Sequence, residues 1–414
     1  MSTAKIAVMG FGVVGSGTVE LFYRNKDIIE KRSGTSIDIK YILDLRDFPD
    51  SPYRDKFTKS FDDILNDPEV TVAAELMGGK TFAYDYTKRL LSRGKSVVTY
   101  NKELVATHGA ELLRIAKENG CNYLFEASVG GGIPIIRPLH KCLAANRFEK
   151  ISGILNGTTN YILTKMIYEQ MSFDEALAQA QALGYAEKDP TADVDGHDAT
   201  RKLCILGSLA FGRHIYPEYV HCSGIRKITL DDVEYAENAG YAIKLIGLIE
   251  NTESGLVATV CPRLVSVNNP LSGVNDVFNA IAVTGDAVGD VLFYGRGAGK
   301  FPTASAVVGD IIDAVKHAGR DIISLNWSDS ENSDFIRPYK SAEVRMYVRV
   351  HAPEADSLKP LITSLFGYVD FIPRKRRSED ELAFITPSLV ESEIDEKLAQ
   401  LSKSAELKKK IRLL

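Results

Sequence analysis

The segment from residue 180 to residue 202 brings together the residue types that acid–base chemistry requires. It holds five acids within a dozen residues and ends on a lysine: Glu187, Asp189, Asp193, Asp195, Asp198 and Lys202. Two glycines and a proline interrupt its first part, so that part is predicted to be a loop. A helix then begins after Asp195 or Gly196, either of which can serve as its N-cap.

Asp198 and Lys202 are four residues apart, so the predicted helix places both side chains on one face. Leu206 continues that face, which indicates that Lys202 lies on or beside the stripe facing the core. A buried lysine needs a carboxylate partner or a function, because an unpaired charge away from water is costly. Most Asp–Lys pairs at this spacing are solvated surface pairs, and the spacing alone leaves that alternative open.

A second pattern, near the N-terminus, predicts a dinucleotide site. Residues 6–9 form a short apolar strand, glycines follow in the spacing Gly-x-Gly-x-x-Gly, and an apolar helix comes next. The glycines allow a tight turn and close approach of a pyrophosphate, which the N–H groups at the helix start favour. A structural turn without ligand is the alternative. The candidate cofactor residues of this turn are Gly10, Phe11, Gly12, Val13, Val14 and Gly15.

The end of the second predicted strand, residues 37–43, bears on the choice of cofactor. Asp44 could bind the ribose 2′-hydroxyl of NAD, whereas Arg46 would favour the 2′-phosphate of NADP. Both residues are present, and a solvated turn is the alternative for each. The sequence therefore predicts NAD or NADP without deciding between them.

Two further strand ends should face the same crevice, because ligands of open α/β sheets bind outside the carboxyl ends of the strands. Met77 and Gly78 follow the strand at 70–76, where glycine would let the backbone approach a nicotinamide. Lys102 follows the strand at 96–99 and should project into the crevice, although most loop lysines are solvated.

Residues 125–134, Phe-Glu-Ala-Ser-Val-Gly-Gly-Gly-Ile-Pro, end another strand and leave the first domain. Its glycines could expose carbonyl groups to a cation beside Glu126, or could simply form a tight crossing between domains.

Length and composition bound the class of protein. The chain has 414 residues, 45% hydrophobic and 25% charged, as expected of a soluble enzyme with two or three domains. A net charge of −5 gives no indication of nucleic-acid binding, and no apolar run reaches transmembrane length. Five cysteines without Cys-x-x-Cys spacing, and an N-terminus without a secretory segment, predict a cytoplasmic protein.

The order of predicted elements divides the chain into three domains. Residues 1–133 alternate strands and helices, as in a doubly wound parallel sheet of Rossmann type, and the segment at about 300–320 returns to it. Residues 134–300 mix helices and strands, as in an α+β domain. After a polar linker, residues 340–414 follow the βαββαβ order of a ferredoxin-like domain.

In sequence order, the glycine turn, Asn101-Lys102, the stretch 126–134, Gly-Ile-Leu-Asn-Gly-Thr-Thr-Asn-Tyr-Ile at 153–162 and the segment 184–202 resemble homoserine dehydrogenase. The resemblance covers nearly the whole chain and is loose only over the last 75 residues or so. It implies NAD(P)-dependent interconversion of L-aspartate 4-semialdehyde and L-homoserine. It also implies that residues 134–300 are a substrate and dimerisation domain and that the assembly is a homodimer or homotetramer. The C-terminal domain would be ACT-like and sense an amino acid such as threonine.

The same resemblance assigns roles to residues of this chain. Lys202 matches the general acid/base, Lys102 the second active-site lysine, and Glu187 the carboxylate that holds the substrate amino group. Asp193 and Asp198 match acids that orient the substrate and the catalytic lysine. The remaining matches are substrate-loop positions and a sodium site: Gly157, Thr158 and Tyr185, and then Glu126 with the carbonyls of Val129, Gly131 and Ile133.

The chain departs from the family pattern at one turn, and an alternative function must be considered. ACT domains open their first helix after an acidic-x-Pro-Gly turn, but residues 351–355 here read His-Ala-Pro-Glu-Ala, which puts effector binding at that turn in doubt. The rival is a non-catalytic regulatory protein that responds to NAD(P) and an amino acid. It would be expected to lack Lys202 or Glu187, and both are present.

Overall fold

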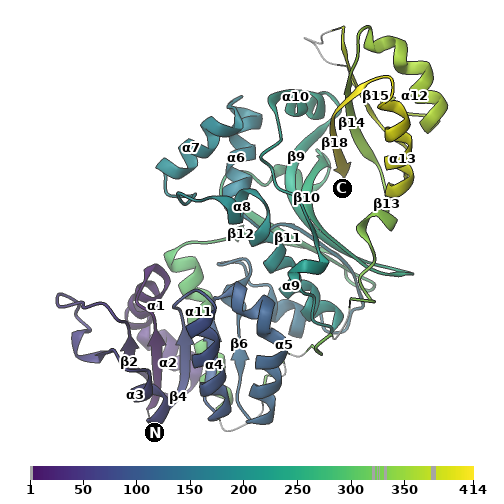
Figure 1. Cartoon of the computed structure of the whole chain (residues 1–414). Coiled ribbons are helices and arrows are strands. Elements are labelled where there is room, and N and C mark those ends of the chain that lie inside the picture. Colours follow the sequence, from purple (N-terminus) through teal and green to yellow (C-terminus); the bar gives the residue numbers. More distant parts are fainter. Residues whose placement is uncertain (1–2, 319–321, 324, 326, 331–332, 374–378) are drawn as a thin grey trace. The chain divides into compact units, whose positions relative to one another are not determined.

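The computed structural model describes residues 3–318, 322–323, 325, 327–330, 333–373 and 379–414 (Figure 1). They form two compact units. Unit one comprises Met1–Phe148, Arg201–Pro217 and Thr284–Ser333, and unit two comprises Glu149–Thr200, Glu218–Val283 and Asp334–Leu414. No helix within the described ranges combines the length and the apolar character needed to cross a bilayer. The boundaries of the three predicted domains stay predictions.

Unit one is built on six parallel strands in the order β3-β2-β1-β4-β5-β6, the strand order of the Rossmann fold. Its strands are β1 (Ala4–Met9), β2 (Ile37–Leu43), β3 (Phe57–Thr58), β4 (Val70–Glu75), β5 (Ser96–Thr99) and β6 (Tyr123–Leu124). The central strands are continuous buried runs, as expected where helices cover both faces. The predicted doubly wound parallel sheet is confirmed.

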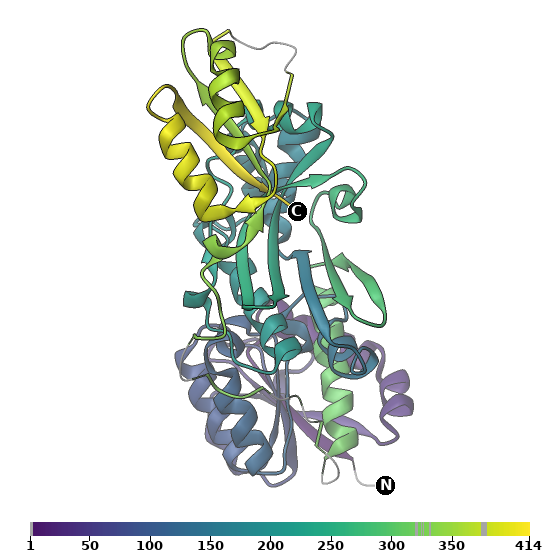
Figure 2. The same ribbon diagram turned by 90° about the vertical axis from the view of Figure 1, so that its right-hand side faces the viewer.

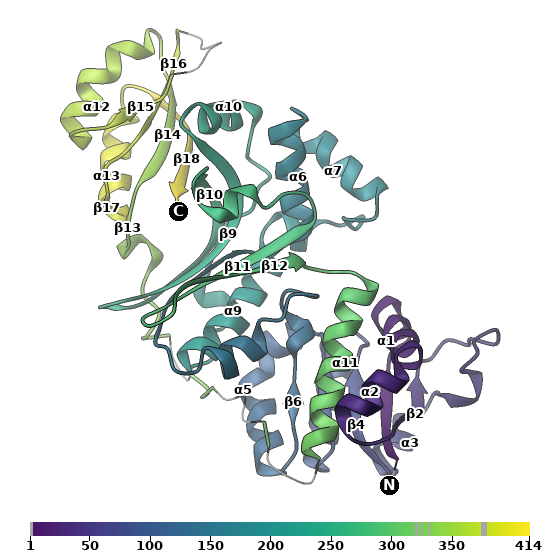
Figure 3. The ribbon, with the colours of Figure 1, turned by 180° about the vertical axis from the view of Figure 1, so that it is seen from behind.

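Helices cover both faces of this sheet. One face carries α1, α2 and α11, as Figure 3 shows, and the other carries α4 and α5 (Figure 1). The helices of unit one are α1 (Val13–Arg24), α2 (Lys26–Ser33), α3 (Phe61–Asn66), α4 (Thr81–Ser92), α5 (Lys102–Glu118) and α11 (Lys300–His317). Strand β12 (Gly289–Arg296) also belongs to unit one, and α9 (His197–Phe211) contributes residues to both units.

Unit two contains a mixed sheet in the order β11-β7-β9-β10-β18-β14-β16-β15, and β8 also pairs with β10. The strands are β7 (Phe148–Ile154), β8 (His221–Cys222), β9 (Tyr241–Thr252), β10 (Gly255–Ser266), β11 (Phe278–Gly285), β14 (Met346–His351), β15 (Asp370–Phe371), β16 (Glu381–Ile385) and β18 (Glu406–Leu413). A small pair joins β13 (Glu343–Val344) to β17 (Leu389–Val390). The helices are α6 (Gly157–Tyr168), α7 (Phe173–Ala182), α8 (Thr191–Val194), α10 (Leu230–Asn238), α12 (Lys359–Phe366) and α13 (Glu391–Leu401).

The last part of unit two follows the predicted βαββαβ order. Strands β14, β15, β16 and β18 pair antiparallel in the order β18-β14-β16-β15, with α12 and α13 between them in sequence. An apolar core joins α12 and α13 to the strands. We call these elements the C-terminal module. The basic stretch Pro-Arg-Lys-Arg-Arg at 373–377 lies outside the described residues except for Pro373.

The C-terminal module shares its sheet with the rest of unit two. Strand β18 pairs in parallel with β10 through Arg263–Arg412 and Leu264–Leu413, so the C-terminus ends against the central strands (Figure 2). The backbone N–H of Leu414 also donates to the carbonyl of Leu264, at 3.0 Å. Removing the module would therefore strip β10 of a neighbouring strand.

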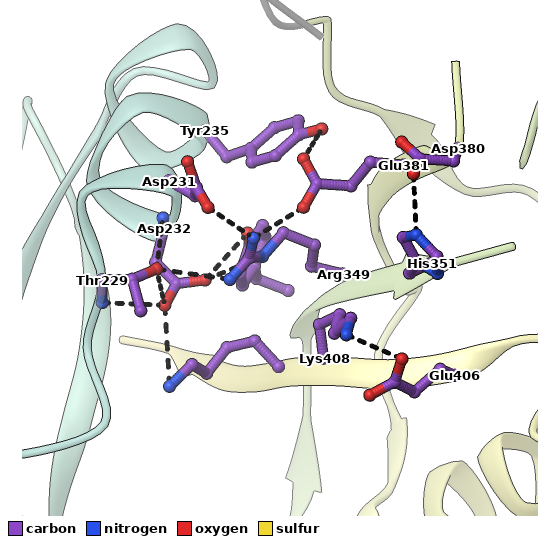
Figure 4. Close-up of polar contacts among 12 residues, drawn as sticks. Thr229, Asp231, Asp232, Tyr235, Arg349, His351, Asp380, Glu381, Glu406 and Lys408 are labelled. Atoms are coloured by element: carbon purple, nitrogen blue, oxygen red, sulfur yellow. Dashed lines mark hydrogen bonds and ion pairs between the residues drawn. The ribbon is translucent and has the colours of Figure 1, made fainter. Parts of the chain in front are cut away.

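A buried cluster of charges joins the C-terminal module to α10 (Figure 4). Arg349 on β14 contacts three carboxylates, at 3.1 Å from Asp231, 3.1 Å from Asp232 and 2.6 Å from Glu381. Asp232 is fully buried, and Tyr235 donates to Glu381 at 3.1 Å. Because water has little access to Asp232 and Glu381, the Arg349 guanidinium balances their charge.

We predict that Arg349→Met destabilises the protein by about 3–5 kcal/mol, because it removes the guanidinium that contacts the buried carboxylates of Asp232 and Glu381. Arg345→Met is the matched control. Arg345 pairs with Asp370 at 2.7 Å, but both side chains are more than 40% exposed, so its loss should cost only about 0–1 kcal/mol. The free energies of unfolding in urea report both values, and equal losses in the two variants would contradict the prediction.

Candidate active site

The carboxyl ends of β1, β2 and β4 open into a cavity of about 650 Å³ in unit one. It lies at the ends of the neighbouring strands β1 and β4, where the strand order reverses, the switch point at which Rossmann folds bind dinucleotides. Most of the predicted cofactor residues line it: Gly10, Phe11, Gly12, Val13, Val14, Asp44, Arg46, Met77 and Gly78. The structure also places there residues that the sequence did not single out, including Lys59, Tyr86 and Tyr100.

The glycine turn requires its glycines for two physical reasons. Gly10 has φ +97°, and a Cβ atom there would lie 2.5 Å from the carbonyl oxygen of Leu76. A Cβ atom at Gly15 would lie 1.9 Å from the carbonyl oxygen of Gly10, so this glycine brings α1 close to the turn. No acid occupies the first turn of α1, which leaves the N–H groups and the helix dipole to attract a phosphate.

Asp44 and Arg46 form a pair on the wall of this cavity. Arg46 donates to Asp44 from Nε at 3.0 Å and from Nη2 at 2.9 Å, and the backbone N–H of Phe11 donates to Asp44 at 2.8 Å. The hydrogen bonds from Arg46 lower the pKa of Asp44 to about 2, against the effect of partial burial. The carboxylate is therefore ionised and already engaged by donors.

Glu75, at the end of β4, is a buried residue that sequence reasoning missed. It accepts hydrogen bonds from the Met77 N–H at 2.9 Å and from the Thr99 hydroxyl at 2.7 Å. Thr99 in turn accepts from the N–H of Asn101, whose side chain donates to the Gly79 carbonyl at 2.6 Å. Burial raises the pKa of Glu75, while these donors favour its charged form. The network ties the loop after β4 to the loop after β5.

Lys102 follows the end of β5, where the sequence placed it, and is the first residue of α5. The side chain of Asn101 caps this helix by accepting from the Leu104 N–H at 3.1 Å. Its neighbour Glu103 contacts Arg201 at 3.4 Å. Lys102 is thereby held at a helix start that the Glu75 network fixes through Asn101.

In unit two, Asn156 holds two of the predicted acids together. Its Nδ2 donates to Asp193 at 2.7 Å and to Asp198 at 2.8 Å, and its Oδ1 accepts from the Thr159 N–H as the N-cap of α6. Asn156 belongs to the motif that carried the resemblance, but no role was predicted for it. The partners of this single amide lie on three different segments, which local sequence patterns do not reveal.

The remaining substrate candidates lie beside Asn156. Thr158 donates to the carbonyl of Tyr185 at 2.6 Å, and the rings of Tyr185 and Tyr161 meet edge to face at 5.1 Å. Gly157 allows close packing, because a Cβ atom there would lie 2.8 Å from the carbonyl of Val277. The Glu187 side chain is exposed, while its backbone carbonyl accepts from Gln181 at 3.0 Å.

Helix α9 carries Asp198 and Lys202 one turn apart, as predicted. Both side chains are buried, with 4% and 8% exposed, so this is not the solvated surface pair that the spacing had left open. Gly196 precedes the helix and its carbonyl accepts from the Thr200 N–H at 2.9 Å. Asp195 bonds instead to Arg226, at 2.6 Å, so it ties the acidic loop (residues 184–196) to a distant segment.

The predicted sodium site is arranged around a carboxylate that already has donors. Glu126 accepts from the backbone N–H groups of Ile135, Ile136 and Arg137, at 2.7–2.9 Å. Among the described residues no group of three or more His, Cys, Asp or Glu side chains could hold a metal ion. Val129 and Ile133 are buried, and a Cβ atom at Gly131 would lie 2.5 Å from the Gly297 carbonyl. These contacts account for the tight turn without a cation.

The strand order, the glycine turn and the buried acid–lysine helix define a nicotinamide-dependent dehydrogenase of Rossmann type. Two family models match the chain, "Homoserine dehydrogenase, NAD binding domain" over residues 10–126 and "Homoserine dehydrogenase" over residues 134–312. The chain belongs to the homoserine dehydrogenase family, which confirms the resemblance seen in its motifs.

Individual relatives agree with this assignment. The homoserine dehydrogenase of Pseudomonas aeruginosa is 38% identical, and the match covers 97% of this chain and 96% of that protein. The crystal structure of a homoserine dehydrogenase from Thiobacillus denitrificans matches with a TM-score of 0.89 and 32% identity, covering 100% of this chain and 98% of that one. A hyperthermophilic archaeal homoserine dehydrogenase mutant in complex with NADPH matches 76% of this chain and 98% of its own, with TM-score 0.65 and 29% identity.

We predict that Asn156→Ala lowers kcat by about 10- to 100-fold, because Asp193 and Asp198 lose the amide that holds them together. The variant also loses an N-cap, which costs about 1 kcal/mol. Ser172→Ala controls for that loss, since Ser172 caps α7 with a complete capping box away from these acids. Steady-state rates and melting temperatures of both variants separate the effects. A kcat within twofold of wild type in Asn156→Ala would refute the role.

Proposed function

We propose that this dehydrogenase interconverts L-aspartate 4-semialdehyde and L-homoserine, with Lys202 as general acid and base. The observation that supports it most is the buried pair of Asp198 and Lys202 on one turn of α9, next to the amide of Asn156. A buried lysine with a carboxylate one turn away is suited to hold and release a proton at a substrate oxygen.

Different residues of the chain would transfer the proton, stabilise the negative charge on the substrate oxygen and bind the substrate. In the reductive direction the Lys202 ammonium donates a proton to the aldehyde oxygen, and in the oxidative direction its amine accepts one from the hydroxyl. Lys102 adds positive charge at the developing alkoxide. The Glu187 carboxylate binds the substrate ammonium, and Asp193 orients it. The bound nicotinamide cofactor supplies or accepts the hydride.

For the cofactor we favour NADP. Arg46 and Lys59 both line the cavity beside Asp44, and Asp44 is already occupied by Arg46 and the Phe11 N–H. Two cations next to an engaged carboxylate suit a 2′-phosphate better than a free 2′-hydroxyl.

Three finer expectations accompany the reaction. A sodium ion would sit at Glu126 with the carbonyls of Val129, Gly131 and Ile133, in addition to the hydrogen bonds that this carboxylate already makes. An amino acid such as threonine would act as effector through the C-terminal module. The assembly would be a homodimer or homotetramer in the cytoplasm.

A substrate panel with the purified protein tests the proposal directly. We expect NADP-dependent oxidation of L-homoserine, with much weaker turnover of other small hydroxy or amino acids. Binding of cofactor without turnover of any substrate in the panel would instead support the rival reading, a regulatory protein on the same fold.

We predict that Lys202→Ala lowers kcat by about 10²–10⁴-fold while NADPH still binds, because the variant removes proton transfer and leaves the cofactor cavity intact. Lys165→Ala is the control, since Lys165 pairs with Glu169 on α6 at 2.5 Å and has no proposed role. Partial rescue of Lys202→Ala by added small amines would identify the lysine as the proton carrier. Turnover near the wild-type rate would reject the assignment.

We predict that Arg46→Ala raises KM for NADPH about tenfold and leaves KM for NADH unchanged or lower, because Asp44 becomes available to a ribose hydroxyl. Arg54→Ala, which alters an exposed arginine outside the cavity, should change neither value. The two KM values measured for each variant check this, and an equal rise for both cofactors would argue against the 2′-phosphate.

A further inference from the structure

One segment of unit two contacts both the acidic loop and the C-terminal module. We call residues 221–232 the bridging segment. Toward the acidic loop, the N–H of Ile225 donates to the Val194 carbonyl at 2.8 Å, and Arg226 bonds to Asp195 at 2.6 Å. The backbones are in tight contact, because a Cβ atom at Gly224 would lie 2.0 Å from the Val194 carbonyl. A shift of this segment would therefore move the loop.

The other end of the bridging segment is held by the C-terminal module. Lys409 on β18 donates to the carbonyl of Lys227 and lies 3.6 Å from Asp232. Arg349 contacts Asp232 and also donates to the Thr229 hydroxyl at 3.3 Å (Figure 4). Thus the same short segment is bonded to β14 and β18 on one side and to the acidic loop on the other.

A cavity of about 280 Å³ separates the bridging segment from β18. Four cationic side chains line it, those of Lys227, Lys409, Lys410 and Arg412. No aspartate or glutamate among the described residues lines it. His221 and Tyr339 also line it, stacked with their ring centres 3.7 Å apart, and Arg412 lies over the Tyr339 ring at 5.2 Å. The walls are therefore cationic and partly aromatic.

The acids that balance these cations stand outside the cavity and are shared. Lys410 bonds to Asp395, which also pairs with Lys340 at 2.7 Å. Lys409 shares Asp232 with Arg349, while Arg412 alone has its own acid, Glu391, at 2.5 Å. Cations thus outnumber carboxylates around the cavity, which favours an anion inside it.

We propose that this cavity binds a compact anion carrying a phosphate or carboxylate group, and that its occupancy is transmitted through the bridging segment to the acidic loop. A zwitterionic amino acid is disfavoured, because no Asp or Glu among the described residues lines the cavity to receive its ammonium group. The anion would draw Lys409 and Lys227 together, and those residues hold the end of the segment whose other end supports Val194 and Asp195.

The electrostatics of His221 agree with a cationic surrounding. Burial, followed by the charges of Arg412, Lys410 and Lys340, lowers the pKa of His221 to about 4, with Glu391 opposing them. Burial likewise lowers the pKa of Lys409. An anion beside His221 would favour its imidazolium form, so binding raises the pKa of His221 and can be followed at that residue.

The test uses the full-length protein with ¹⁵N-labelled histidine, titrated separately with inorganic phosphate and with succinate. We expect a saturable shift of the His221 resonances and a rise in its pKa with at least one of the two anions, and none with L-threonine. The anion that binds more tightly identifies phosphate or carboxylate as the preferred group. No saturable response to either anion, or a response to threonine alone, would overturn the site.

The double variant Lys227→Gln/Lys410→Gln should weaken anion binding by on the order of tenfold, since it removes two exposed cations from the lining. Lys408→Gln is the matched control: Lys408 lies on the same strand, pairs with Glu406 at 2.7 Å, and does not line the cavity. Equal affinity in both variants would place the anion elsewhere and refute the site.

The transmitted effect rests on the proposed function and is measured separately, at saturating cofactor. We expect the anion to change KM for homoserine at least threefold in wild type and in Lys408→Gln, but not in the double variant. An unchanged KM while His221 responds would refute the transmission. If the protein turns over no substrate, the histidine titration still decides the site, so the two failures remain distinguishable.

Discussion

The acidic site depends on the carboxamide of Asn156, which lets two carboxylates lie close together. Two carboxylates, Asp193 and Asp198, approach one small group, and their repulsion would drive them apart without donors between them. The amide offers two N–H groups, one for each acid, while its oxygen is fixed as the cap of α6. The start of α9, with its buried lysine one turn further on, is positioned by that single side chain.

Unit one has a similar arrangement in which the central side chain is the acceptor and its partners are the donors. There the buried Glu75 carboxylate accepts hydrogen bonds from the loop after β4 and from the end of β5. The Asn101 side chain bonds to the first of these loops and caps the helix that begins with Lys102. In both units a buried side chain at the end of a β-strand or the start of a helix satisfies backbone groups that would otherwise cost free energy. Rigidity near the chemistry thus comes from satisfied hydrogen bonds and not from apolar packing alone.

Features whose partners are close in the sequence could be predicted, and contacts between residues far apart in the sequence could not. The glycine turn, the buried strands and the pair Asp198–Lys202 depend on neighbours within a few positions, and all were predicted. Asn156 meets its acids 37 and 42 residues away, and Asp195 meets Arg226 31 residues away, so composition and spacing gave no signal for either contact. The strand pairing that joins the C-terminal module to β10 could not be predicted for the same reason, since it involves residues far apart in the chain.

The pairing of β10 with the last strand has a consequence for synthesis. Arg263 bonds to the carbonyl of Leu413, 150 residues later. At roughly 5–20 residues per second, that part of the β10 edge waits about 8–30 s for its partner while the chain is being made. An uncovered strand edge can pair with another chain, so the nascent protein is most exposed to misassociation in this interval. The sheet is complete only after β18 has left the ribosome.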